Sequence, residues 1–102
     1  MKAVLFAYHE VGAAALDAML RNKIDVVAVF THRDDPSEGG WFRSVAMTAA
    51  KHGIPVHAPD DINHPIWIER VQDMGPDVLV SAHYRKMIGS DMLDVCPNHC
   101  YN

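Results

Sequence analysis

Residues 3–31, AVLFAYHEVGAAALDAMLRNKIDVVAVFT, decide the fold. Two apolar runs in this stretch, residues 3–8 and 25–31, have the length and the β-branched and aromatic content of buried strands. Between them, residues 11–22 carry apolar side chains at helical spacing. The side chains predicted to face inward are Val11, Ala14, Ala15, Ala18, Met19 and Leu20. Strands that are apolar along their whole length are typical of a parallel sheet covered on both faces, so the stretch is a β-α-β unit.

The same alternation continues along the rest of the chain. Helices are predicted for residues 41–52, 66–74 and 91–95, and strands for residues 54–57, 77–82 and 99–102. In the second helix, the residues expected to face inward are Val45, Ala46, Ala49 and Ala50. We therefore expect residues 1–102 to form a single α/β domain with a Rossmann-like, doubly wound, mainly parallel sheet and right-handed crossovers.

Turn and capping residues mark the ends of the predicted helices. Gly53 suits the position just after the second helix. The third helix begins at Asn63 or His64 with Pro65 in its first turn. Ser90 is the expected N-cap of the fourth helix.

Composition excludes several classes of protein. The formal charge is −4 with no basic patch, which argues against nucleic acid as a partner. The apolar runs are much shorter than the roughly 20 residues of a membrane span, and no signal peptide is recognisable at the N-terminus. With only two cysteines in 102 residues, a disulfide framework is not expected, and a reducing cytoplasm is the default location.

Motifs for common cofactors are missing from the sequence. The first strand-to-helix turn contains only Gly12, whereas a dinucleotide fingerprint needs three glycines there, and no Walker A motif occurs. The seven histidines are scattered, and Cys96 and Cys100 lack a second pair of ligands. We therefore expect no metal site.

Polar residues gather where the predicted strands end, which is where ligands bind in open parallel sheets. The turn YRKMI at residues 84–88 has two interpretations on its residues alone: a surface loop, or a turn whose backbone hydrogen-bonds a flat heterocycle. Asn102 also has two: a fraying chain end, or a carboxamide that stabilises the oxyanion of an acyl-transfer intermediate.

The sequence resembles the formyltransferase family that uses 10-formyltetrahydrofolate, over the whole chain. Within that family it is most similar to the N-terminal formyltransferase domain of UDP-4-amino-4-deoxy-L-arabinose formyltransferases, which belong to bifunctional proteins of polymyxin resistance and lipid A modification. The matching segments are VLFAYHEVG at 4–12, VFTH at 29–32, SVA at 44–46, GIPV at 53–56, APDDINHPIWIER at 58–70, PDVL at 76–79 and YRKMI at 84–88. The match departs from the family pattern at His83 and in the residues before Asn102.

The resemblance implies a function and roles for particular residues. Formyl transfer from 10-formyltetrahydrofolate, as cosubstrate, to the amine of a UDP-amino sugar would involve Asn102 as a catalytic residue. Lys86, Met87 and Ile88 match the segment whose backbone binds the folate. The family's catalytic His and Asp follow the Asn and are not among these 102 residues, so the chain is expected to be the N-terminal part of the catalytic domain and to be inactive alone.

Two alternatives remain open from the sequence. The chain could belong to a related formyltransferase that acts on another amino sugar or on methionyl-tRNA. It could instead be a non-catalytic module that binds folate or a nucleotide, or that self-associates through an exposed terminal strand.

Overall fold

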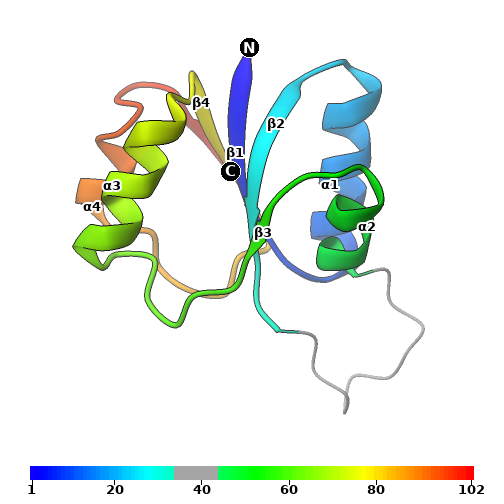
Figure 1. Cartoon of the computed structure of the whole chain (residues 1–102), viewed down its shortest axis with the longest axis horizontal. Coiled ribbons are helices and arrows are strands. Elements are labelled where there is room, and N and C mark those ends of the chain that lie inside the picture. Colours follow the sequence, from blue (N-terminus) through cyan, green and yellow to red (C-terminus); the bar gives the residue numbers. More distant parts are fainter. Residues whose placement is uncertain (34–43) are drawn as a thin grey trace.

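The sheet has a Rossmann-like arrangement with helices on both faces. A computed structural model describes residues 1–33 and 44–102. In chain order the elements are β1 (Lys2–Ala7), α1 (His9–Arg21), β2 (Asp25–Phe30), α2 (Val45–Lys51), β3 (Val56–His57), α3 (Pro65–Met74), β4 (Val78–Ala82), α4 (Ser90–Leu93) and β5 (Cys100–Tyr101). The strands lie in the order β3-β2-β1-β4-β5, and every neighbouring pair is parallel. Helices α1 and α2 cover one face, and α3 and α4 cover the other (Figure 1). The predicted fold class is confirmed.

Strand β1 lies at the centre of the sheet and is buried on both sides. Its side chains alternate between two apolar clusters, because successive residues of a strand point to opposite faces. Ala3, Leu5 and Ala7 contribute to the cluster under α1 and α2. Val4 and Phe6 contribute to the cluster under α3 and α4. The continuous apolar run in the sequence is thus the mark of a strand with no solvent-facing side.

Helix α1 approaches the sheet through small residues, and its inward face differs from the predicted one. The buried residues are Gly12, Ala13, Leu16 and Met19. Val11, which was predicted to face inward, is 59% exposed, and Ala14 is also exposed. Almost every residue from 11 to 20 is apolar, so the spacing alone could not fix the face. Contact with the sheet fixes it instead, since a Cβ on Gly12 would lie 2.9 Å from the Cβ of Ala7.

Helix α2 is shorter than the sequence predicted. Ser44 is extended and caps the helix, with its hydroxyl accepting a hydrogen bond from the Met47 backbone N–H at 3.2 Å. The helix therefore begins at Val45, and the first predicted residues, 41–43, lie outside the described part of the chain. Val45 and Ala49 are buried as predicted, whereas Ala50 is exposed.

Helix α3 has the predicted caps at both ends. The Nδ1 atom of His64 accepts a hydrogen bond from the Ile66 N–H, and Pro65 is the first helical residue. Gly75 ends the helix in the left-handed conformation, with φ 63°, which glycine adopts without the steric cost of a side chain.

Helix α4 begins one residue earlier than predicted. Its N-cap is Gly89, which has no capping side chain, and Ser90 is the first helical residue rather than the cap. The Gly89 N–H is already held by the side chain of Asn63, a long-range contact that local sequence does not reveal. None of the helices in residues 1–33 and 44–102 has the length and apolar content to cross a bilayer.

Replacement of Gly12 by alanine tests the close approach of α1 to the sheet. On helix propensity alone the change would stabilise the protein by up to about 1 kcal/mol. The added methyl would clash with Ala7 and with Val45, whose Cγ2 would lie 3.0 Å away, so we expect destabilisation of about 1–3 kcal/mol. Urea denaturation measures the effect. Val11→Ala, at the exposed neighbouring position, is the control and should change stability by less than about 0.5 kcal/mol. Stabilisation by Gly12→Ala would contradict the packing described.

Candidate functional site

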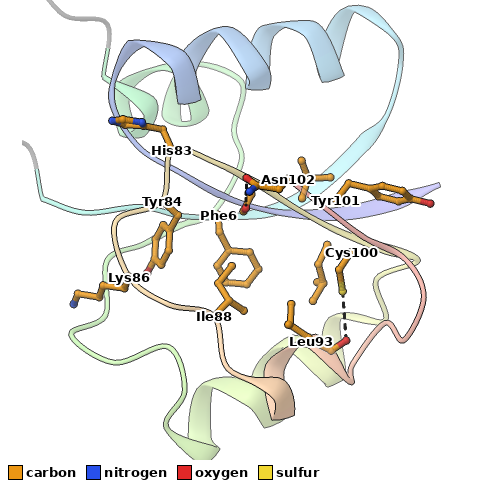
Figure 2. A pocket seen from close by; sticks show the side chains of 12 residues that line it. Phe6, His83, Tyr84, Lys86, Ile88, Leu93, Cys100, Tyr101 and Asn102 are labelled. Atoms are coloured by element: carbon orange, nitrogen blue, oxygen red, sulfur yellow. Dashed lines mark hydrogen bonds between the residues drawn. The ribbon is translucent and has the colours of Figure 1, made fainter.

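A cavity lies where β4 and β5 end, beside the point where the strand order changes direction. Its volume is about 450 Å³, within the usual range of roughly 300–1,000 Å³ for small-molecule sites. The wall is partly apolar and partly polar. It is lined by Phe6, Leu79, Val80, Ser81, His83, Tyr84, Lys86, Ile88, Leu93, Cys100, Tyr101 and Asn102. Figure 2 shows these side chains, with Phe6 and Ile88 close together in the middle and Asn102 above them. The fold thus creates a hollow where parallel sheets commonly bind ligands.

Three of the four residues that the sequence singled out line this cavity. Asn102, Lys86 and Ile88 reach it from β5 and from the segment after β4. Met87 does not line it, because its side chain is 84% exposed and points elsewhere. The Met87 carbonyl accepts a hydrogen bond from the side chain of Asn63. Any part that Met87 has in ligand binding would therefore come through its backbone.

Asn102 is held with one end of its carboxamide engaged. The Ser81 hydroxyl donates a hydrogen bond to the Asn102 Oδ1 atom at 3.0 Å. The NH₂ group, the donor end, has no partner within the described part of the chain. A free N–H donor at the edge of a cavity is the group needed to stabilise an oxyanion.

The ammonium group of Lys86 is directed at the loop before α3. It donates hydrogen bonds to the carbonyl of Asp60 and, at 3.5 Å, to that of Pro59. The charge is thus used to connect two segments, and the rest of the side chain is available to line the cavity.

Aromatic rings form the floor between the cavity and the sheet. Phe6 stacks on Phe30 with ring centroids 5.1 Å apart and meets the edge of Tyr84 at 5.7 Å. The Tyr84 hydroxyl is buried and has no hydrogen-bond partner among the described residues. Burial, with a smaller contribution from Asp61, raises the pKa of Tyr84 to about 12. Tyr84 is therefore a neutral part of the wall at any physiological pH.

His32, at the end of β2, fixes the turn that follows β4. Its ring stacks on Tyr84 with centroids 4.4 Å apart, and its Nε2 atom accepts a hydrogen bond from the Arg85 N–H at 3.0 Å. The Arg85 guanidinium lies over the ring of Tyr8, 4.6 Å from its centroid. Burial, together with the charges of Lys86 and Arg85, lowers the pKa of His32. The imidazole is thus kept neutral, as its acceptor role requires.

Ile88 offers a free pair of backbone groups beside the cavity. No protein group among the described residues hydrogen-bonds the Ile88 N–H or C=O. Backbone groups are normally paired when they are not in contact with water. An adjacent donor and acceptor on one residue can bind a flat heterocycle that has a matching acceptor and donor on its edge.

Several residues of the site were not singled out by the sequence. Ser81 orients Asn102, and Asn63 holds the segment around Ile88, whereas His32, which holds the turn, was among the polar residues expected at the strand ends. Asn63 had been considered as a helix start and as part of the matching segment 58–70, without a role in the site. The contacts join residues far apart in the chain, so no local spacing could have revealed them. Residues 1–33 and 44–102 contain no group of three or more His, Cys, Asp or Glu that could hold a metal ion.

The neutral state of His32 predicts a dependence of stability on pH. Burial also lowers the pKa of His57, with a smaller contribution from Arg70. As pH falls below the ordinary histidine value of 6.5, the unfolded chain binds protons before the folded chain does. Stability from these groups is therefore complete above that pH and is lost below it.

His32→Gln should reduce this loss on acidification, because glutamine keeps an acceptor for Arg85 and does not titrate. Urea denaturation at several pH values from about 7 to 5 measures the slope. His52→Gln is the control, since His52 is exposed and its ring bonds the Thr48 carbonyl of its own helix. An equal acid sensitivity in wild type and His32→Gln would contradict this account.

Comparison with solved structures gives the same fold in formyl-group enzymes. Phosphoribosylglycinamide formyltransferase from Bacillus halodurans matches with a TM-score of 0.72 and 19% identity, over 98% of this chain and 54% of that one. Glycinamide ribonucleotide transformylase 1 from Symbiobacterium toebii matches with a TM-score of 0.70 and 20% identity, over 98% and 49%. A formyltetrahydrofolate deformylase from Pseudomonas putida matches with a TM-score of 0.61 and 19% identity, over 97% and 36%.

No family model matches the sequence. The chain spans about half the length of the two transformylases that it resembles. At these identities the likeness concerns the fold, and it covers nearly the whole chain. The 102 residues thus have the Rossmann-like α/β fold that formyltransferases and a formyltetrahydrofolate deformylase share in the matched part.

Proposed function

We propose that this chain is part of a formyltransferase that uses 10-formyltetrahydrofolate as its formyl donor. The observation that carries the proposal is the unpaired N–H and C=O of Ile88 next to a cavity at the carboxyl ends of the strands. The pterin ring of a folate is flat and has donors and acceptors along its edge. Solved structures of the same fold that are named for formyl-group chemistry support the proposal.

The composition of the cavity wall suits such a ligand. Phe6 and Ile88 offer apolar surface for the faces of a ring, and the neutral Tyr84 adds an aromatic side. The stem of Lys86 lines the same wall, while its ammonium bonds the loop before α3. In this proposal the segment 86–88 binds the folate mainly through its backbone, with Met87 contributing only its main chain.

In this proposal Asn102 supplies a hydrogen-bond donor for the chemistry. In the reaction the acceptor amine forms a bond to the formyl carbon, the bond from that carbon to N10 of the folate breaks, and a proton passes from the amine to N10. The carbonyl oxygen carries negative charge in the tetrahedral intermediate. The NH₂ group of Asn102 would donate to that oxygen, a contribution of about 3 kcal/mol in comparable sites, while Ser81 holds the other end of the carboxamide.

The acceptor we propose is the amine of UDP-4-amino-4-deoxy-L-arabinose. The support is the sequence resemblance, in which FAYH at residues 6–9 and NHPIW at residues 63–67 favour the amino-sugar branch. Two residues of the matching segment 58–70 contact the candidate site. The Asp60 carbonyl accepts a hydrogen bond from Lys86, and the Asn63 side chain donates one to the Met87 carbonyl. The two cysteines are free thiols, in keeping with a reaction in the reducing cytoplasm.

Folate binding can be tested with 5-formyltetrahydrofolate, a stable analogue of the donor, by isothermal titration calorimetry. We expect one ligand per chain. Ile88→Asp should weaken binding at least about tenfold, because it places a carboxylate in the apolar wall. Met87→Asp is the matched control, since it adds the same charge one residue away on an exposed side chain, and it should leave binding within about threefold. Equal losses in the two variants would show that the ligand does not use this cavity.

Turnover separates binding from catalysis. With 10-formyltetrahydrofolate and UDP-4-amino-4-deoxy-L-arabinose, we expect no formyl transfer by the 102 residues alone, because the resemblance implies that a catalytic His and Asp follow Asn102, and acid–base groups normally contribute about 10²–10⁴-fold. Product is followed by mass spectrometry. Transfer above the uncatalysed background would refute this expectation.

A further inference from the structure

The Asn63 side chain bonds the backbone on both sides of Ile88, the residue that we place at the centre of the folate site; we call this pair of bonds the bracket. The Asn63 Nδ2 group donates a hydrogen bond to the Met87 carbonyl at 3.0 Å. The Gly89 N–H donates a hydrogen bond to the Asn63 Oδ1 atom at 2.7 Å. Both ends of one carboxamide are therefore bound, one on each side of Ile88.

The geometry of the peptide bond makes this bracket an orienting device. The Met87 carbonyl and the Ile88 N–H belong to one peptide group, and the Ile88 carbonyl and the Gly89 N–H belong to the next. No cis peptide bond occurs in the described residues, and in a trans peptide the C=O and N–H point in opposite directions. When Asn63 binds the Met87 oxygen and the Gly89 nitrogen, the N–H and C=O of Ile88 turn away from it together. These are the two groups that have no protein partner.

Asn63 is itself held firmly. The carboxylate of Asp61 accepts a hydrogen bond from the Asn63 N–H at 2.9 Å. Ile62, the residue between them, is fully buried in the cluster beneath α3, and His64 caps that helix. The Lys86 ammonium adds a bond from the ligand-facing segment to the Asp60 carbonyl. The loop before α3 is thus anchored in the core and connected to the segment 86–89 at both ends.

Because Gly89 has no side chain, it leaves room for the Asn63 carboxamide. A Cβ at this position would lie 2.9 Å from the Asn63 Oδ1 atom. Its φ of −75° is one that any residue can adopt, so the requirement for glycine comes from the contact with Asn63. Because the obstructing atom is the end of a polar side chain, alanine here should displace the carboxamide at little cost in overall stability.

We propose that Asn63 is a positioning residue of the folate site. It does not touch the ligand but presents the Ile88 N–H and C=O as a fixed edge that the heterocycle binds. The inference rests on the proposed function, because it assigns a role within that same site. It extends the function to the loop before α3, which the sequence identified as the start of a helix and part of a matching segment, without a role in binding.

The test measures folate binding and backbone protection in the same variants. Asn63→Ala removes both bonds, and Gly89→Ala displaces the carboxamide without altering Asn63. Asn22→Ala is the matched control, since it removes an asparagine whose Nδ2 bonds a backbone carbonyl, that of Ala18 at 2.7 Å, at the end of α1. Titration calorimetry with 5-formyltetrahydrofolate gives the affinity, hydrogen exchange gives the protection of the Gly89 amide, and thermal unfolding checks that each variant is folded.

We expect Asn63→Ala and Gly89→Ala to weaken binding by about tenfold, since two hydrogen bonds no longer hold the edge in place, and to speed exchange of the backbone amide at position 89. Asn22→Ala should stay within about twofold of wild type. If the wild type binds and both site variants bind as well as Asn22→Ala, the inference is overturned while the proposed function stands. If the wild type itself does not bind, the proposed function fails and the inference fails with it. If Asn63→Ala does not fold, Gly89→Ala decides.

Discussion

Burial of β1 on both faces is the constraint on which the rest of the structure depends. Residues 3–7 of this strand are completely shielded from solvent, and they pair with β2 on one side and β4 on the other. Neither apolar cluster can form without a helix layer above it, so the two layers and the parallel order follow from the same run of side chains. Parallel order in turn brings the carboxyl ends of the strands to one edge, where the candidate site lies.

The sequence predicted the strands well because their signal is local. A strand covered on both faces is apolar at every position, and such runs are visible without knowledge of the partner. The caps of α3 were predictable for the same reason. His64 and Pro65 act on the first turn of the helix, and Gly75 acts on the last. The predicted inward face of α1 was right for Met19 and wrong for Val11 and Ala14, because apolar residues surround the helix and the contact of Gly12 with Ala7 selects the face.

The site was only partly predictable. Strand ends and the resemblance in residues 84–88 indicated Lys86, Ile88 and Asn102, and these residues line one cavity. The bonds that hold these residues and their neighbours come from Asn63, Ser81 and His32, which lie 21 to 53 residues away in the chain from the groups they bond. The same long-range bond explains the early start of α4, because the Gly89 N–H bonds Asn63 before the helix begins. The ligand-binding segment 84–88 could be inferred from sequence, whereas the long-range contacts that orient its backbone required the fold.

The central claim is that the backbone of Ile88 forms the binding edge for the formyl donor. A crystal structure of the protein with 5-formyltetrahydrofolate tests it most directly. The account predicts the pterin ring in the cavity against Phe6 and Tyr84, hydrogen-bonded to the Ile88 N–H and C=O, with Asn63 still bound to Met87 and Gly89. A ligand bound elsewhere, or one in the cavity that leaves both backbone groups of Ile88 unpaired, would contradict it.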